Sequence, residues 1–423
     1  MTEAWQPLLT GEQADRAWAA IHAIARDIGP AGAGQAPVSR RPAAAWGLAG
    51  GAAGKALFFA YLTLATGDEQ AAEAAHDFLE AALAGAAGEP LTLGLWEGLL
   101  GVTWTYDHLA GRLFETDDSE STSDADALLL RLLDGPRSSV GHGLISGLAG
   151  YGIACLEGLP RPGARRALDR ILDHLLVTAE STAEVCRWFT PARLLPDWQR
   201  QLAPGGYYDV GVAHGNPAVL ALLARCVGAG LRADELTPVL ERCVKWVLDQ
   251  GTSGRFPGRV VEGVDRLPKP RLSWCYGDPG VAGALRVAAA ACGRADWQEQ
   301  AVRIARRTAT REPGETGIDD ASLCNGSAGL AHVFHRFYRA TGDAELGRAA
   351  RFWFADSLDR RQPDRGVGGF QACVLPPGKT GRAAIEWVDE PGLLTGAAGT
   401  GLCLLAAVSD LEPVWDRCVL LSP

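Results

Sequence analysis

The sequence is poor in charge and has no paired cysteine motif. Only 21% of its 423 residues are charged, and the formal net charge is -10. Recognition of nucleic-acid phosphates needs a basic face, so this balance argues against a general nucleic-acid-binding protein. The ten cysteines include no CxxC pair. This spread predicts reduced thiols, mostly buried as small apolar residues.

Targeting and membrane signals are also missing. The first 29 residues lack a basic stretch followed by an apolar run, so they do not predict a signal peptide. The longest weakly polar stretch, from Leu393 to Val408, is interrupted by glycines and is too short to predict a membrane span. We therefore expect a cytoplasmic protein without a membrane-spanning segment.

Glycine, in contrast, is abundant and follows a pattern. Six pairs of glycines spaced three residues apart recur along the chain, and a seventh copy has Ala218 in place of the second glycine. The successive first glycines lie 47, 49, 68, 62, 49 and 70 residues apart, which indicates an internal repeat. The seven copies are Gly51/Gly54, Gly98/Gly101, Gly147/Gly150, Gly215/Ala218, Gly277/Gly280, Gly326/Gly329 and Gly396/Gly399.

Each copy predicts a pair of helices. Apolar segments such as Lys55–Ala65 and Leu330–Ala340 follow the glycines and indicate a buried inner helix. In three repeats a glycine stands 13 residues after the second motif glycine, where it would end that helix: Gly67, Gly293 and Gly342. Amphipathic segments then indicate an outer helix that returns, as in Ala71–Ala82 and Leu346–Leu358, where Phe352 alone breaks the apolar pattern.

Seven helix pairs cannot each bury their own apolar face, so they must stack on one another. We therefore predict an all-α fold, an (α/α)7 toroid of seven inner and seven outer helices with the glycine turns at one end. Residues 1–45 are expected to form an entry helix, from Gly11 to Ile28, and a linker rich in Gly, Pro and Ala. Residues 46–423 are expected to form a single repeat domain.

Three other segments stand out between the repeats. The two widest gaps, before the fourth and the seventh copies, predict insertions on one face, which in repeat proteins is often the binding face. The acidic run from Glu115 to Asp126 is interpreted as a solvated loop, with a docking strip for a basic peptide as the alternative. Gly378-Lys379-Thr380 lacks the leading glycine and the strand of a phosphate loop, so we discount it.

Reactive residues stand beside three of the glycine turns. His214 precedes Gly215, Cys275 precedes Gly277 by two residues, and Cys324 precedes Gly326 by two residues. If equivalent turns converge in a ring, two thiolates and an imidazole could bind zinc or perform acid/base chemistry. Spacing alone leaves a second interpretation open, in which Cys275 and Cys324 are two buried thiols.

The motifs around these turns resemble a known family. Trp274-Cys-Tyr-Gly277, Ala213-His-Gly215 and Leu323-Cys-Asn-Gly326, together with the glycine series over nearly the whole chain, resemble the lanthionine synthetase C-like (LanC) cyclases. The resemblance implies an α/α toroid with one zinc ion held by Cys275 and Cys324. It implies a lanthipeptide cyclase that adds a cysteine thiol of a dehydrated precursor peptide to dehydroalanine or dehydrobutyrine, forming a thioether. By the same resemblance, His214 is the candidate acid.

The chain departs from the family pattern at two positions. Asn325 stands where the family has a third zinc ligand, and an amide oxygen is a poor zinc ligand beside thiolates. Gly143 stands where the family usually has an acid, and the adjoining His142 is our candidate to line the site in its place. His332 and His335 lie too far along their helix to replace the missing ligand, so we expect core packing or surface exposure for them.

Further residues are candidates for substrate binding. Asp209 would orient His214 or cap a helix, and Arg271 would contact a peptide carboxylate or pair with Asp278. Tyr208, with Tyr207 and Trp274, would line a peptide groove or belong to the core. The expected partners are a dehydrated precursor peptide and a lanthipeptide dehydratase.

Two alternatives to the cyclase remain open from the sequence. The first is a LanC-fold protein that has lost full catalysis and acts as a peptide-binding or complex-organising partner, which Asn325 and Gly143 favour. The second is a glutathione-adding enzyme that shares the metal chemistry and differs in its substrate.

Overall fold

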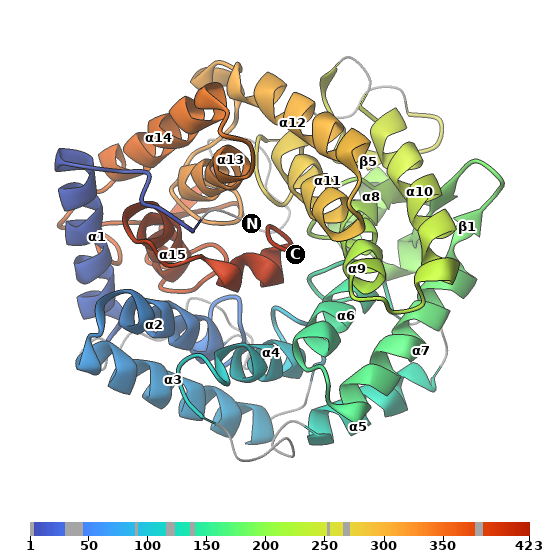
Figure 1. Cartoon of the computed structure of the whole chain (residues 1–423), viewed down its shortest axis with the longest axis horizontal. Coiled ribbons are helices and arrows are strands. Elements are labelled where there is room, and N and C mark those ends of the chain that lie inside the picture. Colours follow the sequence, from blue (N-terminus) through green and yellow to red (C-terminus); the bar gives the residue numbers. More distant parts are fainter. Residues whose placement is uncertain are drawn as a thin grey trace. The chain divides into compact units, whose positions relative to one another are not determined.

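The computed structural model describes residues 4–29, 45–88, 92–115, 123–135, 140–251, 254–264, 271–376 and 384–423. The chain divides into two compact units, each built mainly from helices (Figure 1). Unit 1 comprises Met1–Thr92, Trp96–Thr116 and Ile318–Trp415. Unit 2 comprises Leu93–Leu95, Asp117–Gly317 and Asp416–Pro423. The predicted boundary at residue 45, with a single repeat domain beyond it, stays a prediction.

Seven of the described helices begin directly after the first glycine of a predicted pair. None of them has a side-chain cap at its N-terminus, and all are largely buried. The glycine series therefore correctly marks where the inner helices begin. They are α2 (Ala52–Thr66), α4 (Leu99–Leu109), α6 (Leu148–Glu157), α9 (Asn216–Gly228), α11 (Asp278–Cys292), α13 (Ser327–Thr341) and α15 (Ala397–Val408).

Amphipathic outer helices follow six of these inner helices. Five outer helices pack against the inner helix that precedes them, whereas α5 packs against α7. In α14, Trp353 and Phe354 are buried while Phe352 is half exposed, as the sequence pattern predicts. The six are α3 (Glu69–Gly88), α5 (Ser123–Leu133), α7 (Pro162–Thr178), α10 (Ala233–Asp249), α12 (Ala295–Ala309) and α14 (Ala344–Asp359).

The last inner helix takes its outer partner from the start of the chain. Helix α1 (Glu12–Ile28), the predicted entry helix, packs against α15 (Figure 1). The segment before α1 is tied to the same helix, because Trp5 donates its indole N–H to the carbonyl of Ala406 at 2.9 Å. Leu8 and Leu9 donate their backbone N–H groups to the carbonyl of Ala407. The entry helix therefore completes the seventh pair.

Glycine also ends three of the inner helices, as predicted. Gly67, Gly293 and Gly342 each occupy the left-handed region, with φ of 72°, 63° and 68°. Their N–H groups bind carbonyls in the last helical turn. A residue with a side chain adopts this conformation at a cost, so glycine is the residue that such helix ends favour.

The second glycine of each pair permits a close approach inside the repeat. A Cβ atom at Gly329 would lie 1.8 Å from the carbonyl oxygen of Leu323, six residues earlier. This distance is far below van der Waals contact, so the turn can pack beneath the first helical turn only when this position has no side chain. Four other repeats show the same contact at 1.9–2.3 Å: Gly54, Gly150, Gly280 and Gly399.

Backbone hydrogen bonds join equivalent turns of neighbouring repeats. The bonded residue is the one two positions before the first glycine of each pair. Within unit 1 the bonds run from Cys324 N–H to Leu394 C=O, from Leu394 to Ala49 and from Ala49 to Trp96. Within unit 2 they run from Ile145 to Ala213 and from Ala213 to Cys275. In each unit this chain of bonds fixes the turns as one layer.

The insertions contain short strands, which the helical repeat did not predict. The wide gap before the fourth repeat begins with the antiparallel pair β1 (Glu180–Ser181) and β2 (Cys186–Arg187). It continues with β3 (Thr190–Pro191), the 3-10 turn η4 (Ala192–Leu194), α8 (Asp197–Leu202) and β4 (Gly206–Asp209). Strand β4 pairs antiparallel with both β3 and β5 (Arg259–Val260). The other wide gap contains the antiparallel pair β6 (Ala372–Val374) and β7 (Glu386–Val388). Short 3-10 segments cover Pro313–Glu315 and Val414–Val419.

The interpretation of the acidic run is wrong at its C-terminal end. Ser123 begins helix α5, and Asp126 is buried and receives hydrogen bonds of 2.8 and 3.2 Å from the guanidinium of Arg161. An ion pair from α7 therefore orders residues that the sequence assigned to a solvated loop. The middle of the run, residues 116–122, and the discounted Gly378-Lys379-Thr380 lie outside the described residues, as does the linker at 30–44.

All ten cysteines are free thiols, and six of them are buried, as predicted. Within the described parts of the chain, no helix combines the length and the apolar character needed to cross a bilayer.

Candidate functional site

A carboxylate stands six residues before the first glycine in three repeats. Asp209, Asp320 and Glu390 each accept a hydrogen bond from the backbone N–H two residues later, at 2.7, 3.0 and 3.0 Å. One carboxylate oxygen therefore holds the turn in each repeat. What the other oxygen contacts differs from one repeat to the next, and this distinguishes the sites.

A cavity of about 530 Å³ in unit 2 lies beside the turn that opens α9. Its polar lining includes His142, Asp209, His214, Tyr207 and Gln199. The opposing wall is apolar and comes from the α5 end, from α6 and from the insertion before α8: Leu132, Val140, Tyr151, Leu194, Leu195 and Pro196. Two predicted catalytic residues, His142 and His214, thus line one cavity.

His214 is exposed, and its ring contributes to the cavity lining. Protein atoms nevertheless remove much of its surrounding water, and this desolvation lowers the pKa of His214 to about 4. The imidazole is therefore neutral at neutral pH, and a neutral imidazole can accept a proton.

His142 is buried, and its Nε2 has no hydrogen-bond partner among the described residues. Burial, together with a smaller effect of the neighbouring His214, lowers the pKa of His142 to about 4. This imidazole nitrogen is thus buried as well as unpartnered, although His142 as a residue lines the cavity.

Gly143 explains why the family's acid is missing here. A Cβ atom at this position would lie 2.8 Å from both the Cα atom and the carbonyl oxygen of His214. The segment bearing Gly143 thus runs directly against the backbone of His214. A carboxylate could not be introduced at position 143 without moving one of the two segments.

Asp209 makes neither of the two predicted contacts directly. Its carboxylate binds the Gly211 N–H at 2.7 Å and the Tyr276 hydroxyl at 3.1 Å, rather than orienting His214 directly. Helix α9 begins at Gly215 without a side-chain cap, so Asp209 does not cap it. Burial raises the pKa of Asp209 to about 7, although the two hydrogen bonds and Arg259 oppose the change.

Tyr207, rather than Tyr208, faces the cavity. Successive side chains of a strand point to opposite sides, and on β4 this puts Tyr207 in the lining, with its hydroxyl 2.9 Å from Gln199. Tyr208 instead binds Glu180 through its hydroxyl at 2.6 Å and packs beneath the guanidinium of Arg187. The sequence did not fix which of the two neighbours faces inward.

The turn that opens α11 carries Cys275, a half-buried thiol with its Sγ 3.4 Å from the hydroxyl of Ser273. Trp274 belongs to the core, because it is buried and donates its indole N–H to the carbonyl of Val419. The first glycine of this repeat, Gly277, has φ of 96°, a conformation that favours glycine.

Arg271 and Asp278 flank this turn but do not form the ion pair considered from the sequence. The Asp278 carboxylate accepts hydrogen bonds from the Phe256 N–H and from the guanidinium of Arg311. Arg271 is half-buried beside Gly317. Its contact with a peptide carboxylate stays a prediction.

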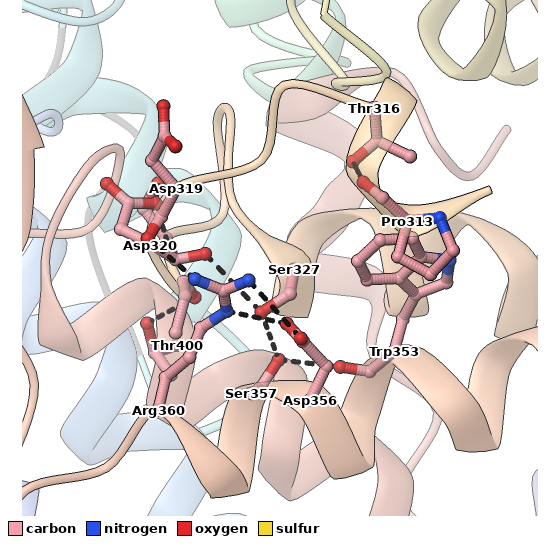
Figure 2. Close-up of polar contacts among 12 residues, drawn as sticks. Pro313, Thr316, Asp319, Asp320, Ser327, Trp353, Asp356, Ser357, Arg360 and Thr400 are labelled. Atoms are coloured by element: carbon pink, nitrogen blue, oxygen red, sulfur yellow. Dashed lines mark hydrogen bonds and ion pairs between the residues drawn. The ribbon is translucent and has the colours of Figure 1, made fainter. Parts of the chain in front are cut away.

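The turn that opens α13, in unit 1, carries Cys324, which is also half-buried. Asp320 is buried there and accepts hydrogen bonds from the Ser322 N–H and hydroxyl and from the Cys373 N–H. Figure 2 shows the surrounding network, in which Ser327 meets Ser357 and Arg360 reaches Asp356 and the Asp319 carbonyl. A cavity of about 390 Å³ lies beside this turn and includes Asp319, Asp320, Arg360 and Trp387 in its lining.

Asn325 is engaged by its own turn. Its side-chain oxygen lies 3.1 Å from the Ser322 hydroxyl, which is also 2.8 Å from Asp320. Ser322 has a single proton, and the acceptor-only carboxylate of Asp320 takes it. The Asn325 amide is therefore better oriented with its NH₂ group toward Ser322. His332 and His335 are fully buried in α13, so of the two placements left open by the sequence the structure shows the core.

Within the described residues, no group of three or more His, Cys, Asp or Glu side chains is arranged to hold a metal ion. The donors that suit zinc at the predicted positions are the two half-buried thiols, one in each unit. Thiolates are soft ligands that favour zinc, whereas the amide of Asn325 does not. By donor type, the two thiols therefore suit zinc, and a zinc site at Cys275 and Cys324 stays a prediction.

Two residues near this cavity, Tyr276 and Gln199, have no role predicted from the sequence. Tyr276 lies inside the Trp-Cys-Tyr-Gly motif, next to Cys275, and this position was the signal that it belongs to the site. Gln199 has no comparable signal, because it comes from an insertion without a repeat equivalent.

Two comparisons with known proteins agree with this architecture. A family model described as lanthionine synthetase C-like protein matches residues 43–420. Among solved structures, nisin cyclase matches with a TM-score of 0.71 at 16% sequence identity, over 90% of this chain and 93% of that chain. At this identity the match shows a shared fold, and it confirms the fold class predicted from the glycine series.

Proposed function

Since the chain belongs to the lanthionine synthetase C-like family, whose model matches residues 43–420, we propose that it is a lanthipeptide cyclase. Its substrate is a dehydrated ribosomal precursor peptide. The reaction adds the thiol of a peptide cysteine to the β-carbon of dehydroalanine or dehydrobutyrine, and the product is a lanthionine or methyllanthionine thioether.

The observation that carries the proposal is the joint lining of one cavity by His142 and His214. The turn bearing Cys275 adjoins it, because Ala213, next to His214, donates its backbone N–H to the Cys275 carbonyl at 3.3 Å. Proton-transfer groups and a thiol of this chain thus come from neighbouring turns of unit 2.

The proton balance of the reaction fits a neutral histidine. The peptide thiol loses its proton to His214, and the resulting thiolate forms a carbon–sulfur bond with the β-carbon of the alkene. The electron pair of the double bond moves onto the α-carbon as an enolate. That carbon then takes the same proton back from His214, directly or by relay through His142, so the sum is an isomerisation without a leaving group.

Zinc is part of the proposal through Cys275 and Cys324. Both thiols stand two residues before a helix-opening glycine and are half-buried, in contrast to the six buried cysteines. When bound, zinc lowers the pKa of a coordinated thiol and so supplies the nucleophilic thiolate at neutral pH. The two protein thiolates would hold the ion and keep its environment rich in electrons.

Further elements of the proposal concern binding and location. Arg271 contacts a carboxylate of the peptide, and Tyr207 replaces Tyr208 as the tyrosine that faces it. The protein works with a lanthipeptide dehydratase in the cytoplasm.

A synthetic peptide with one dehydroalanine and one cysteine tests this function. Cyclisation leaves the mass unchanged but removes the free thiol, so the peptide loses its reaction with N-ethylmaleimide in a mass spectrum. We expect this loss with the wild-type protein and with His22→Asn, an exposed histidine on α1, and not with His214→Asn. Persistence of the thiol with zinc-loaded wild-type protein would contradict the proposal.

A second function is favoured by the two departures from the family. Gly143 leaves no room for a carboxylate, and Asn325 is held by Ser322. These features suit a LanC-fold protein that binds a peptide without closing rings. That protein would bind the same synthetic peptide in a titration while leaving its thiol free.

A further inference from the structure

The tyrosine next to Cys275 is held in a slot that two other residues create. A Cβ atom at Gly211 would lie 2.5 Å from Cδ1 and Cε1 of Tyr276. The aromatic ring therefore packs directly on the backbone of residue 211, and any side chain at this position would displace it.

The Asp209 carboxylate closes this slot at both ends. Its Oδ1 accepts the N–H of Gly211, the floor of the slot, at 2.7 Å. Its Oδ2 accepts the hydroxyl of Tyr276 at 3.1 Å. Because Asp209 is 1% exposed, little water competes for these two bonds. One buried carboxylate thus binds both the backbone beneath the Tyr276 ring and the hydroxyl at the end of that ring.

Tyr276 then transmits this arrangement to the cavity. Its ring lies 6.0 Å from the His214 ring, between centroids, at an interplanar angle of 31°. The backbone bond between Ala213 and Cys275 ties the two turns at their base. The position of His214 in the cavity therefore depends on a ring that belongs to the next repeat.

Equivalent carboxylates make no such connection. The second oxygen of Asp320 accepts a backbone N–H from Cys373 on β6. Glu390 holds the Gly392 N–H, and the charge near it is the amine of Lys55. The turn bond is thus a shared structural device, whereas the bond to an aromatic hydroxyl is particular to Asp209.

We propose that Asp209 is a positioning residue, which clamps Tyr276 in the Gly211 slot and thereby sets the orientation of His214 for proton transfer. The inference rests on the proposed cyclase function for its catalytic meaning. Its geometric content does not depend on that function.

Nuclear magnetic resonance of protein with labelled histidine tests the geometry. The eight histidines give few signals, and a His214→Gln spectrum assigns the one of interest. Asp209→Asn keeps an acceptor for Gly211 but reverses the bond to Tyr276, and Tyr276→Phe removes the hydroxyl alone. We expect both to shift the His214 ring signals, while the matched Glu390→Gln leaves them at the wild-type position. Unchanged His214 signals in both variants would overturn the proposal.

Kinetics of the synthetic peptide provide a second readout. Asp209→Asn and Tyr276→Phe should each lower kcat by about 10- to 100-fold through misplacement of His214, with KM nearly unchanged. The double variant should be no slower than either single variant, because both act through one contact. Additive losses would overturn the clamp. Shifted His214 signals in a protein that closes no ring would support the clamp and reject the cyclase.

Discussion

The turns that open α9 and α13 share a scaffold but use it differently. Both have a buried carboxylate six residues before a glycine, with one oxygen on the backbone N–H two residues later. At α9 the other oxygen reaches an aromatic hydroxyl of the next repeat, and at α13 it reaches a backbone N–H of the β6 insertion. The repeat thus provides the same turn at both sites, and the two turns differ in the group that the second carboxylate oxygen binds.

The first residue of the helix differs between the same two turns. Asn216 is fully buried and its side chain binds the Trp188 N–H, the Trp188 carbonyl and the Asp209 carbonyl. Ser327 binds the Ser357 hydroxyl at 2.7 Å and, at 3.4 Å, the Asp320 carbonyl. The first residue of α9 is therefore bound to the insertion before it, whereas the first residue of α13 is bound to the outer helix α14.

The largest effect is expected at a position where the two turns differ, because the α9 turn has Ala218 where the α13 turn has Gly329. Gly329→Ala would put a methyl group 1.8 Å from the Leu323 carbonyl oxygen, and we expect a loss of about 3 kcal/mol or more in the free energy of unfolding. Gly314→Ala is the control, because a Cβ there meets no atom within 4 Å. Thermal or denaturant unfolding measures both. Equal midpoints for the two variants would refute the close packing.

The carboxylate of the α9 turn should make stability depend on pH. Burial raises the pKa of Asp209 to about 7 from its ordinary value of 3.8. At a pH between these two pKa values, Asp209 keeps its proton in the folded protein and has lost it in the unfolded chain. The free energy of unfolding therefore falls as the pH rises from about 4 to about 7. Asp209→Asn removes this slope, a difference of at most about 4 kcal/mol.

The measurement compares denaturant unfolding of the wild-type protein and of Asp209→Asn at several pH values. The free energy of unfolding of the variant, relative to that of the wild-type protein, should rise with pH up to about pH 7 and stay constant above it. A difference that is constant across this range would contradict the raised pKa.

Asn216→Ala tests how far the α9 turn depends on side-chain bonds. The change leaves the buried N–H and carbonyl of Trp188 without their partner, and we expect a loss of about 2 to 3 kcal/mol in the free energy of unfolding. Urea unfolding checks the value. A loss below about 0.5 kcal/mol would mean that water satisfies those groups.

Ser327→Ala is the matched change at α13 and should have the smallest effect. It removes a hydroxyl whose partner, Ser357, keeps its bond to the Trp353 carbonyl at 2.8 Å. We expect a loss of about 1 kcal/mol, measured in the same unfolding experiment. If Ser327→Ala costs as much as Asn216→Ala, the contrast between the turns disappears.

The regular part of the fold could be predicted from the sequence because it depends on local rules. A glycine that opens or ends a helix acts through its own backbone and its near neighbours, so Gly67, Gly293, Gly342 and the seven turns could be recognised. The pairing of α1 with α15 could not, because nothing local in either helix specifies a partner at the other end of the chain.

The candidate site was predictable only in part, for the same reason. His142 and His214 could be named because they adjoin motif glycines. The inward side of β4 was not evident, because Tyr207 and Tyr208 are chemically alike and only the pairing with β3 and β5 fixes which one faces the cavity. The partner of Asp209 lies 67 residues away in another repeat, and no spacing rule connects them.

The pairing of the first helix with the last inner helix has a consequence during protein synthesis. Among the described α-helices, α1 is translated first and its partner α15 last. The apolar side of α1 must therefore remain uncovered while nearly all of the polypeptide is translated. Prematurely terminated chains that lack α15 would keep that side bare, and they are expected to aggregate or to be captured by chaperones.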